Sequence, residues 1–302
     1  MTSVPEFPEF KAIELDDRYF FRDVFWKYQP QTSELTFTNL FIWRDHYGIQ
    51  WSKYRDWLMV ISTTDENKIF AFPPIGPPSH LEVVRLLLKW LAQEKAQKEP
   101  RIERTDQILV SEVQGASDLL VEPTPDHFDY VYRSEDLIKL AGRTYHSKRN
   151  HIHQLEQEYS FVYSPLNQEL VEPCLTLAEN WCEFHRCEED LNLLDEWEAV
   201  QQALNHFVSL KIKGGVIQID NKVEAFALGE LLNQQTAVVH IEKANPEIPG
   251  LYTLINRLFC EKLWSNIPYV NREQDLGEPG LRKAKLSYFP EHMVEKFKIR
   301  LV

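Results

Sequence analysis

Alternating apolar and polar positions in the last third of the chain predict three strands followed by a helix. Three segments rich in valine, isoleucine, alanine and phenylalanine are separated by short polar turns at Asp220-Asn221 and at 233–235. After a break at 245–250, apolar residues between 251 and 263 recur at the spacing of one helical face. A strand, a charged loop with two glycines, a second helix in the basic segment and a final strand at 295–302 are expected beyond it. The pattern predicts a mostly antiparallel sheet with one helix packed on it after the third strand.

The first half of the chain shows the same order of elements with little sequence identity. A short strand runs into the proline-rich loop at 73–78, and an amphipathic helix is expected at 79–99. Ser79 and Glu82 have the spacing of a capping box, in which two side chains satisfy free amides at the helix start. Further strands are expected within 36–62, at 106–113 and at 128–134.

The recurrence of strand, proline-rich loop and helix in both halves predicts two modules of one architecture. We interpret them as tandem GNAT-like acyltransferase modules, an α+β (α/β) fold with mixed, mostly antiparallel sheets flanked by helices. The N-terminal module is expected at 1–133 and the C-terminal module at 134–302, with a helical insertion at 134–212. Within the insertion, Asp195 and Glu198 again have capping-box spacing at the predicted start of a helix.

Composition and charge limit the class of protein. The 302-residue chain is 43% hydrophobic and rich in aromatic residues, which is typical of a folded protein with two cores. Its net charge of −13 repels polyanions on average and argues against a general DNA-binding surface. The N-terminus lacks the features of a secretory signal, and no run reaches the roughly 20 apolar residues of a membrane span. Four cysteines at irregular spacing indicate reduced thiols, so we expect a cytoplasmic protein.

One stretch of this acidic chain is strongly basic. Residues 139–153 contain four cations and three histidines with no acidic residue, and Lys148 and Arg149 lie within it. Such a segment suits contacts with phosphate groups through charge-assisted hydrogen bonds. The alternative is a solvated helix face whose cations pair with acidic neighbours.

A second charged stretch surrounds the glycines Gly277 and Gly280. Charged residues of both signs precede this turn and basic residues follow it, so opposite charges flank a tight backbone turn. Such an arrangement can hold a carboxylate in place or bind an anionic substrate, and its alternative is a salt-bridged connection between two elements. The charged residues are Arg272, Glu273, Asp275, Arg282, Lys283 and Lys285.

The hairpin formed by residues 223–243 offers a third candidate site. His240 and Glu242 alternate onto one face of a strand, and Glu230 is expected on the same face of the neighbouring strand. A histidine beside carboxylates can act as a general base toward an amine or a hydroxyl. The alternative is a core histidine whose ring is satisfied by structural partners.

Other familiar site patterns are missing from the sequence. Cys182 and His185 share a helix face, but Cys187 points elsewhere and no second pair has zinc spacing, so we expect no metal. The chain contains no Walker loop, no GxSxG and no GxGxxG motif. Nucleotide hydrolysis, serine hydrolysis and dinucleotide redox chemistry therefore lose support.

Four longer segments resemble a known family. They are YHSKRNHIHQ, EAFALGELL, HIEKANPEIPGLY and, most specifically, YVNREQDLGEPGLRKAKLSYFP. They are similar to the DUF2156 family, which resembles the C-terminal synthase domain of phosphatidylglycerol lysyltransferase, a tandem GNAT-type fold related to the Fem aminoacyltransferases. The likeness extends from about Phe10 to Val302.

The resemblance implies transfer of an aminoacyl group from charged tRNA to an acceptor, without a metal or other cofactor. It places Lys148 and Arg149 beside the anionic donor. We expect Lys283 or Lys285 to stabilise the charge that develops on the carbonyl oxygen, with Asp275 orienting that lysine. The transfer site implied by the resemblance is lined by Arg272, Asp275, Arg282, Lys283 and Lys285.

The acceptor and the donor stay open at the level of the sequence. Full lysyltransferases carry a fused membrane flippase, whereas we expect this chain to act without one, on a lipid headgroup, a peptide or a small amine. A CoA-dependent N-acyltransferase is an alternative, but the loop 244–250 has two prolines and one glycine where a CoA site uses backbone amides. The other alternative is a GNAT-fold protein that binds tRNA, peptide or lipid headgroup without catalysis.

Overall fold

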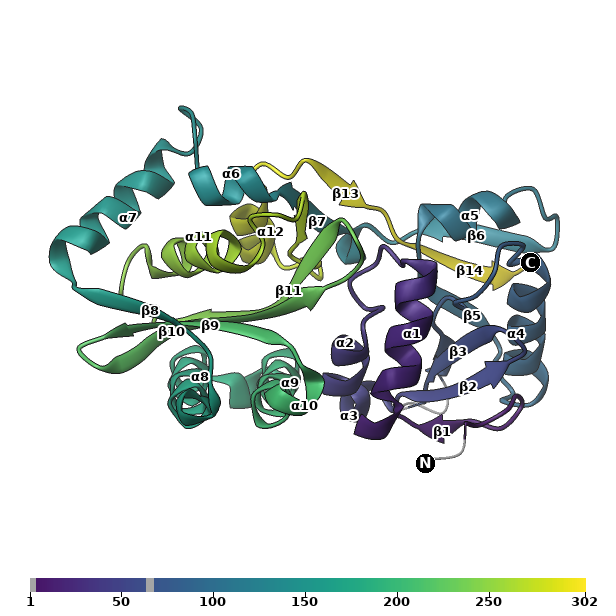
Figure 1. Cartoon of the computed structure of the whole chain (residues 1–302). Helices are drawn as coiled ribbons and strands as arrows, with labels where there is room; N and C mark the ends of the chain where they lie inside the picture. The colour runs from purple at the N-terminus through teal and green to yellow at the C-terminus, as the bar shows by residue number, and fades with distance from the viewer. Residues whose placement is uncertain (1–3, 64–67) are drawn as a thin grey trace. The chain divides into compact units, whose positions relative to one another are not determined.

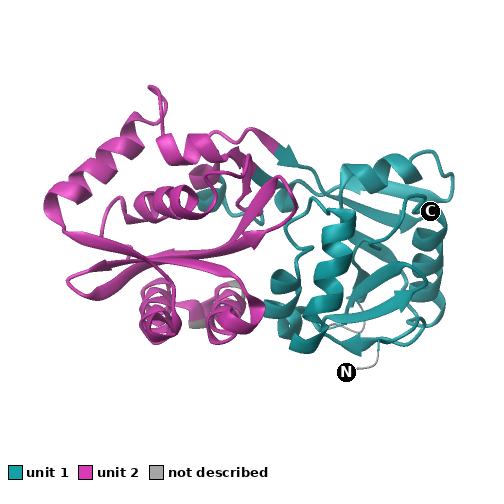
Figure 2. Cartoon of the chain, viewed as in Figure 1, with its two compact units in different colours: residues 1–130, 274–282, 293–302 teal, residues 131–273, 283–292 magenta. Residues whose placement is uncertain are grey.

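Two seven-stranded sheets form the framework of the protein in the computed structural model, which describes residues 4–63 and 68–302 (Figure 1). Residues 1–3, which the predicted N-terminal module includes, lie outside the described residues. The chain divides into two compact units, coloured separately in Figure 2. Unit 1 consists of residues 1–130, 274–282 and 293–302, and unit 2 of residues 131–273 and 283–292.

The sheet of unit 1 contains strands from both ends of the chain. Its order is β1-β2-β3-β4-β5-β14-β6, with β4 and β5 parallel and the other neighbours antiparallel. The final strand β14 inserts between β5 and β6, whereas we predicted that it completes the C-terminal module. The strands are β1 (Lys11–Ala12), β2 (Gln50–Tyr54), β3 (Trp57–Ser62), β4 (Phe70–Ala71), β5 (Arg101–Thr105), β6 (Leu119–Pro123) and β14 (Phe297–Leu301).

Helix α4 (Leu81–Gln93) supplies much of the core of unit 1. We expected Ser79 and Glu82 to form a capping box, but neither side chain caps this helix, whose N-cap is His80. The carboxylate of Glu112 instead accepts hydrogen bonds from the backbone amides of Ser79 and His80, each at 2.8 Å. A neighbouring helix thus satisfies the free amides. The buried face of α4 is the predicted one and includes Val84, Leu87, Leu88 and Leu91.

The segment 106–113, which we predicted as a strand, is the helix that carries Glu112. It forms α5 (Gln107–Val113), and the side chain of Asp106 caps it by accepting a hydrogen bond from the amide of Leu109 at 3.0 Å. An aspartate at this position satisfies one of the first free amides of a helix. This local signal outweighs the β-type composition of the segment.

The segment 36–62 also begins as a helix rather than as a strand. Thr36 caps α2 by accepting from the amide of Asn39 at 3.1 Å, and the predicted strands β2 and β3 follow after a second short helix. The cap again decides the start of the element. The remaining helices of this region are α1 (Arg18–Tyr28), α2 (Phe37–Ile42) and α3 (Arg44–Tyr47).

The second sheet has the order β13-β7-β12-β11-β10-β9-β8 and is built largely from unit 2. The antiparallel run β9-β10-β11 is the predicted three-strand run, and β11 pairs in parallel with β12. Helices α6, α7 and α11 lie on one face of this sheet, and α8, α9 and α10 lie on the other (Figure 1). The strands are β7 (Asp129–Arg133), β8 (Phe161–Pro165), β9 (Lys213–Ile219), β10 (Lys222–Leu231), β11 (Thr236–Ala244), β12 (Tyr269–Asn271) and β13 (His292–Val294).

For the helices of this region, one prediction is confirmed and one is wrong. The helix expected before the final strand is α12 (Pro279–Leu286), which carries the basic residues and begins at a proline, whose missing N–H costs nothing there. Helix α9 begins at Leu191, so Asp195 lies inside it and does not start it. No helix in the described ranges is both long and apolar enough to cross a membrane. The others are α6 (Ser134–Lys139), α7 (His146–Glu158), α8 (Val171–His185), α9 (Leu191–Asn205), α10 (Phe207–Leu210) and α11 (Leu251–Leu263).

A β-bulge interrupts the pairing of β10 with β11 at His240. Gly229 pairs with Val239 and the next pair along β11 involves Ile241, so His240 is skipped in the register. A Cβ at Gly229 would lie 2.3 Å from the carbonyl oxygen of Val238, so only glycine fits this close approach of two strands. The parallel pairing of β11 with β12 also ends at Val238. His240 therefore lies where β11 leaves its regular ladders.

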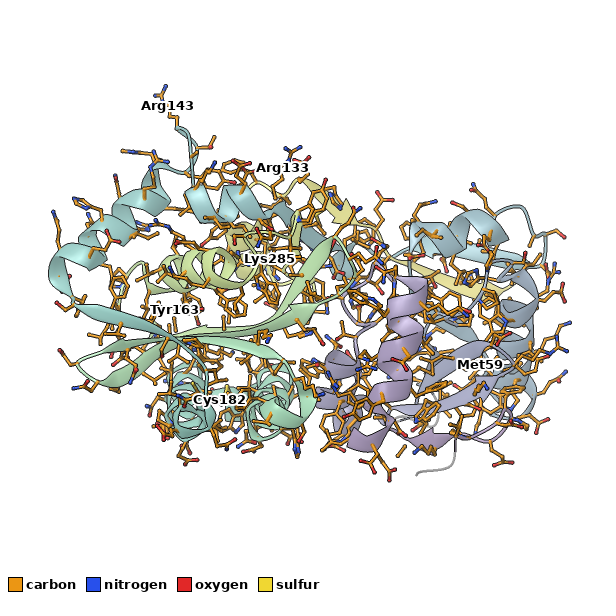
Figure 3. The ribbon with its side chains drawn as sticks, in the orientation of Figure 1. Met59, Arg133, Arg143, Tyr163, Cys182 and Lys285 are labelled. Atoms are coloured by element: carbon orange, nitrogen blue, oxygen red, sulfur yellow. A yellow bond between two sulfur atoms is a disulfide. The ribbon has the colours of Figure 1, made fainter. Side chains whose placement is uncertain are left out.

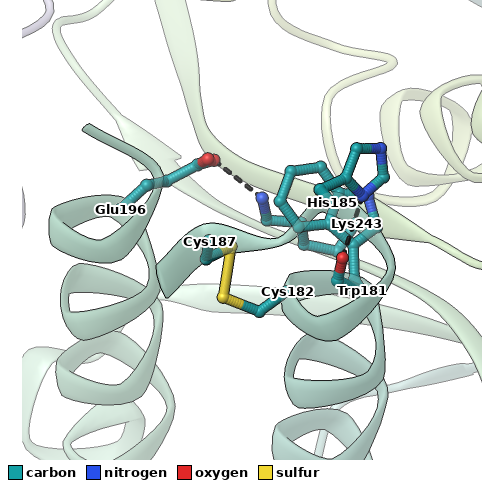
Figure 4. The surroundings of a disulfide bond; sticks show 6 residues. All are labelled: Trp181, Cys182, His185, Cys187, Glu196 and Lys243. Carbon is teal, nitrogen blue, oxygen red and sulfur yellow. Dashed lines mark hydrogen bonds and ion pairs between the residues drawn. A yellow bond between two sulfur atoms is a disulfide. The ribbon is translucent and has the colours of Figure 1, made fainter. Parts of the chain in front are cut away.

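A disulfide joins Cys182, in the last turn of α8, to Cys187, which follows that helix (Figure 4). Helix α8 ends before Arg186, whose left-handed backbone reverses the chain and brings the two Cα atoms within 5.1 Å. The prediction that all four cysteines are reduced thiols is therefore wrong for this pair. Cys174 and Cys260 are buried and free.

Candidate active site

The predicted site residues are divided between the two units. Asp275 and Arg282 belong to unit 1. The others belong to unit 2. Glu242 of β11 contacts Asn256 of α11, so it lies on the face of the sheet that α11 covers. We call the group formed by Lys148, Glu242, Asn256, Arg272 and Tyr288 the polar cluster. The predicted residues in unit 2 are Lys148, Arg149, Glu230, His240, Glu242, Arg272, Lys283 and Lys285.

His240 bridges two carboxylates, and only 2% of its side chain is exposed. Its Nε2 lies 3.1 Å from Oε1 of Glu230, and its Nδ1 lies 2.8 Å from Oε1 of Glu273. Burial alone would lower the pKa of His240, but hydrogen bonds to the two carboxylates raise it to about 9. At neutral pH the ring is an imidazolium that donates from both nitrogens. In this form it has no free lone pair, so His240 can act as a general base only above its pKa.

Arg272 and Glu242 form an ion pair inside unit 2. Nη2 of Arg272 donates to both carboxylate oxygens of Glu242, at 3.1 and 3.2 Å, and Nδ2 of Asn256 donates to the same carboxylate at 3.1 Å. The guanidinium also lies 4.8 Å from the ring centroid of Tyr288. Burial acts to lower the pKa of Arg272, but the Glu242 carboxylate raises it above the usual range. The result is a fixed positive charge in the interior.

Lys148 reaches the same aromatic ring from α7. Its Nζ lies 3.4 Å from the centroid of Tyr288 and 2.8 Å from Oγ of Ser287. Partial burial, followed by repulsion from Arg272, lowers the pKa of Lys148 to about 8. A lysine with this pKa is present in both protonation states near neutral pH. Lys148 therefore has the properties of an acid–base group.

Arg149 turns back onto its own segment. Its Nη1 donates to the carbonyl oxygens of Leu140 and Gly142, the second at 2.8 Å. It therefore fixes the loop that leads into α7. Arg143 projects outward from this loop (Figure 3). The predicted basic segment thus contains at least one cation with a structural role and another that points into solvent.

The two lysines of α12 have different surroundings. The ammonium of Lys285, labelled in Figure 3, donates to the carbonyl oxygens of Arg272 and Glu273, the second at 3.3 Å. It therefore holds the backbone that presents the side chains of Arg272 and Glu273. Lys283 is exposed.

Asp275 and Arg282 form a separate ion pair in unit 1. Arg282 donates to both carboxylate oxygens of Asp275, at 2.8 and 2.9 Å, and to Asp126 at 2.8 Å. The hydroxyl of Tyr130 and the amide of Gly277 also donate to Asp275, which is 1% exposed. Burial opposes its ionisation, but these donors lower the pKa of Asp275 to about 2. Asp275 closes the glycine loop, and these bonds give no support to its predicted role of orienting a catalytic lysine.

Two side chains of the cluster were not predicted from the sequence. Asn256 is 1% exposed on the apolar face of α11, and a polar residue at such a position is a signal in itself, because a buried amide needs partners. Tyr288 contacts Lys148 and Arg272 through its ring. No local spacing indicates that contact, since the two cations come from distant parts of the chain.

The cluster in unit 2 provides the means for acyl transfer. A fixed guanidinium can stabilise negative charge on a carbonyl oxygen, and a lysine that titrates near pH 8 can move a proton. In the described part of the chain, no group of three histidine, cysteine, aspartate or glutamate side chains is placed to hold a metal ion.

Comparison with known proteins gives the family. The family model described as phosphatidylglycerol lysyltransferase, C-terminal, matches residues 25–300, and the chain belongs to this family. A crystal structure of a conserved protein of unknown function from Bacteroides thetaiotaomicron VPI-5482 is 30% identical, with a TM-score of 0.89 over 97% of this chain and 99% of that chain. No curated protein matches the sequence.

Solved structures of lower identity share the fold. L-PGS from Bacillus licheniformis has a TM-score of 0.65 at 9% identity, over 99% of this chain and 94% of that chain. FemX has a TM-score of 0.58 at 9% identity, over 96% of both chains. A tandem GNAT protein from the clavulanic acid biosynthesis pathway has a TM-score of 0.51 at 9% identity, over 97% of this chain and 98% of that chain. The predicted family and the predicted tandem GNAT-like fold are confirmed.

Proposed function

We propose that the protein transfers an aminoacyl group from the 3′ end of a charged tRNA to an amine or hydroxyl acceptor, with no metal or other cofactor. The observation that carries the proposal is the buried guanidinium of Arg272, held by Glu242 beside a lysine, Lys148, whose pKa is about 8. The family of the chain and its likeness to FemX support the same class of reaction.

In this reaction the nitrogen or oxygen of the acceptor attacks the ester carbonyl carbon of the donor. A bond forms between them, negative charge develops on the carbonyl oxygen, and the bond from the carbonyl carbon to the ribose oxygen breaks. Arg272 donates a hydrogen bond to the carbonyl oxygen, which helps most in the transition state. Neutral Lys148 takes the proton that the acceptor loses and returns it to the leaving ribose oxygen. Atoms and charge balance without a further reactant.

The loop before α11 supports an aminoacyl donor over acyl-CoA. A Cβ at Gly250 would lie 2.7 Å from the carbonyl oxygen of His151, so α7 covers the loop at this point. Several loop amides already have partners: Glu247 and Ile248 donate to Asn245, and Leu251 donates to Ile248. A pyrophosphate needs free amides at a helix start, and the amide of Leu251, the first residue of α11, is already bonded.

The basic segment 139–153 is proposed to face the phosphates of the donor, with Arg143 exposed and Arg149 bracing the loop. Lys148 links this segment to the transfer site. The acceptor is a lipid headgroup, a peptide or a small amine. The site of action is the cytoplasm, where charged tRNA is made.

The proposal is tested by titrating the protein with acetyl-CoA, uncharged tRNA and charged tRNA at low and moderate salt. We expect charged tRNA to bind with an affinity that falls as the salt concentration rises, because phosphate contacts release counterions. Acetyl-CoA should show no binding. Loss of the aminoacyl ester is then followed with hydroxylamine as a general acceptor. The variant Arg272→Met should lose this activity, and Lys262→Ala, an exposed cation on α11, should retain it. Saturable binding of acetyl-CoA without binding of tRNA would overturn the proposal in favour of an ordinary N-acyltransferase.

A further inference from the structure

The buried amide of Asn256 has an oxygen with no hydrogen-bond partner among the described residues. Its Nδ2 donates to Oε2 of Glu242 at 3.1 Å, while Oδ1 has no hydrogen-bond partner among the residues that the structure describes. The orientation of the amide is determined by chemistry, because a carboxylate accepts and only the NH2 end can donate to it. With 1% of Asn256 exposed, the unpaired acceptor lies inside unit 2.

Arg272, which binds the same carboxylate, has a buried donor without a partner among the described residues. Its Nη2 donates to both oxygens of Glu242, but the buried Nη1 has no partner in the described part of the chain. An unpaired acceptor and an unpaired donor therefore flank one buried carboxylate, on side chains that both contact its Oε2. Buried polar atoms are paired in the great majority of cases, so two orphans at one place call for a ligand or water.

The charges around these two atoms indicate which chemical groups a ligand would need. Glu242 would attract a cation toward Oδ1 of Asn256, while the guanidinium of Arg272 would attract a partly negative oxygen toward Nη1. The cluster continues outward through the ring of Tyr288 to the half-buried Lys148. A ligand that carries an N–H donor close to a carbonyl oxygen matches both orphans.

We propose that Asn256 determines specificity by accepting a hydrogen bond from the α-ammonium of an aminoacyl group, while Nη1 of Arg272 donates to the carbonyl oxygen. The inference rests on the proposed function and deepens it, because it separates aminoacyl donors from plain acyl donors at a named atom. An acetyl or propionyl group has the carbonyl oxygen but no N–H. It leaves Oδ1 of Asn256 buried and unpaired, and sites of this kind discriminate strongly against such analogues.

The test uses two stable analogues that differ at one position. In 3′-deoxy-3′-(alanylamino)adenosine an amide replaces the ester and the α-ammonium is present, and in the 3′-propionylamino compound a hydrogen replaces the amino group. Both are titrated by calorimetry at pH 6.5, where an α-amino group of ordinary pKa, about 8, is charged. We expect the alanyl compound to bind at least about tenfold more tightly to the native protein.

Substitution at Asn256 should remove this preference. The variant Asn256→Leu, of similar shape, should weaken binding of the alanyl compound about tenfold and leave the propionyl compound unchanged. Asn256→Ala serves as a second variant if the leucine disturbs folding, which a thermal melt detects. The matched control Asn180→Leu changes an exposed asparagine on α8, outside the proposed site and the basic segment, and should keep the native preference.

Each outcome decides one of the two proposals. Equal binding of both compounds to the native protein overturns the role of Asn256 and leaves the aminoacyl-transfer proposal standing. Parallel weakening of both compounds in Asn256→Leu shows that the amide holds only water or the fold, and also overturns it. If neither compound nor charged tRNA binds, the proposed function fails, and the inference fails with it.

Discussion

Nδ1 of His240 lies 2.8 Å from Oε1 of Glu273, at the place where the parallel pairing of β11 with β12 has ended. The bulge in β11 leaves His240 out of the register of β10, and its Nε2 contacts Glu230 of that strand. One imidazolium thus joins β10, β11 and the segment after β12. Because that segment also carries Arg272, the ion pair positions the guanidinium on which the proposed reaction depends.

The stability of the protein should decrease at alkaline pH through His240. Its pKa is raised from an ordinary value near 6.5 to about 9, so its contribution is fully present below about pH 6.5 and is lost as pH rises through about 9. The shift corresponds to roughly 3 kcal/mol at most. Urea unfolding from pH 6 to pH 10 measures this loss, and His240→Gln should unfold with a much flatter pH dependence. Identical pH dependence in native protein and variant would exclude the imidazolium as its source.

Lys148 should determine the pH dependence of transfer. If its neutral form accepts the proton, kcat/KM rises with pH through an apparent pKa near 8. Lys148→Met should lower the rate by a factor of about 10² to 10⁴ and remove this limb of the profile. The hydroxylamine assay over pH 6.5–9.5 provides the measurement.

Lys148→Arg separates charge from proton transfer. It keeps the positive charge beside Tyr288 but stays protonated throughout this pH range. A variant with full activity and the native profile would show that Lys148 supplies only charge. An inactive variant with unchanged binding of charged tRNA would agree with the proton-transfer role.

Removal of Arg272 should destabilise unit 2 because it leaves Glu242 buried without its cation. The side chains of Arg272 and Glu242 are 14% and 10% exposed, and breaking such a pair from one side costs about 3–5 kcal/mol. Arg272→Met combined with Glu242→Gln removes both charges and should recover much of the loss. The four proteins form a double-mutant cycle measured by urea unfolding. Additive effects of the two substitutions would contradict a direct pairing.

Local patterns in the sequence were sufficient for much of the fold. The periodicity of α4 and α11 and the polar turns between β9, β10 and β11 depend on near neighbours, and these elements are where we predicted them. The segment 106–113 is a helix because Asp106 caps it, a local signal that we did not weigh. The position of β14, in contrast, could not be predicted from local patterns. A strand sequence does not specify which distant edges it pairs with, so its place between β5 and β6 depends on tertiary contacts.

The candidate site shows the same division between local and distant information. Alternation along the hairpin predicted that His240 and Glu230 share a face, and the two side chains are in contact, but the bulge that takes His240 out of the register was not visible in the pattern. The charge state of His240 depends on Glu273 and on burial, and neither is visible in the spacing. Asn256 contacts Glu242 from another element, so only the fold reveals that its amide oxygen has no partner within 4–63 and 68–302.

The bulge that positions His240 should depend on the glycine opposite it. A Cβ at Gly229 would lie 2.3 Å from the backbone oxygen of Val238 and cannot be accommodated without moving a strand. Gly229→Ala should therefore destabilise the protein by about 1–3 kcal/mol and reduce transfer, because the strand shift displaces His240 and the segment that carries Arg272. Gly280→Ala is the matched control: nothing lies within 4 Å of its Cβ, and alanine should stabilise α12 by about 0.5–1 kcal/mol. Urea unfolding and the hydroxylamine assay test both variants. Equal stability of Gly229→Ala and the native protein would mean that β10 and β11 do not approach this closely in solution.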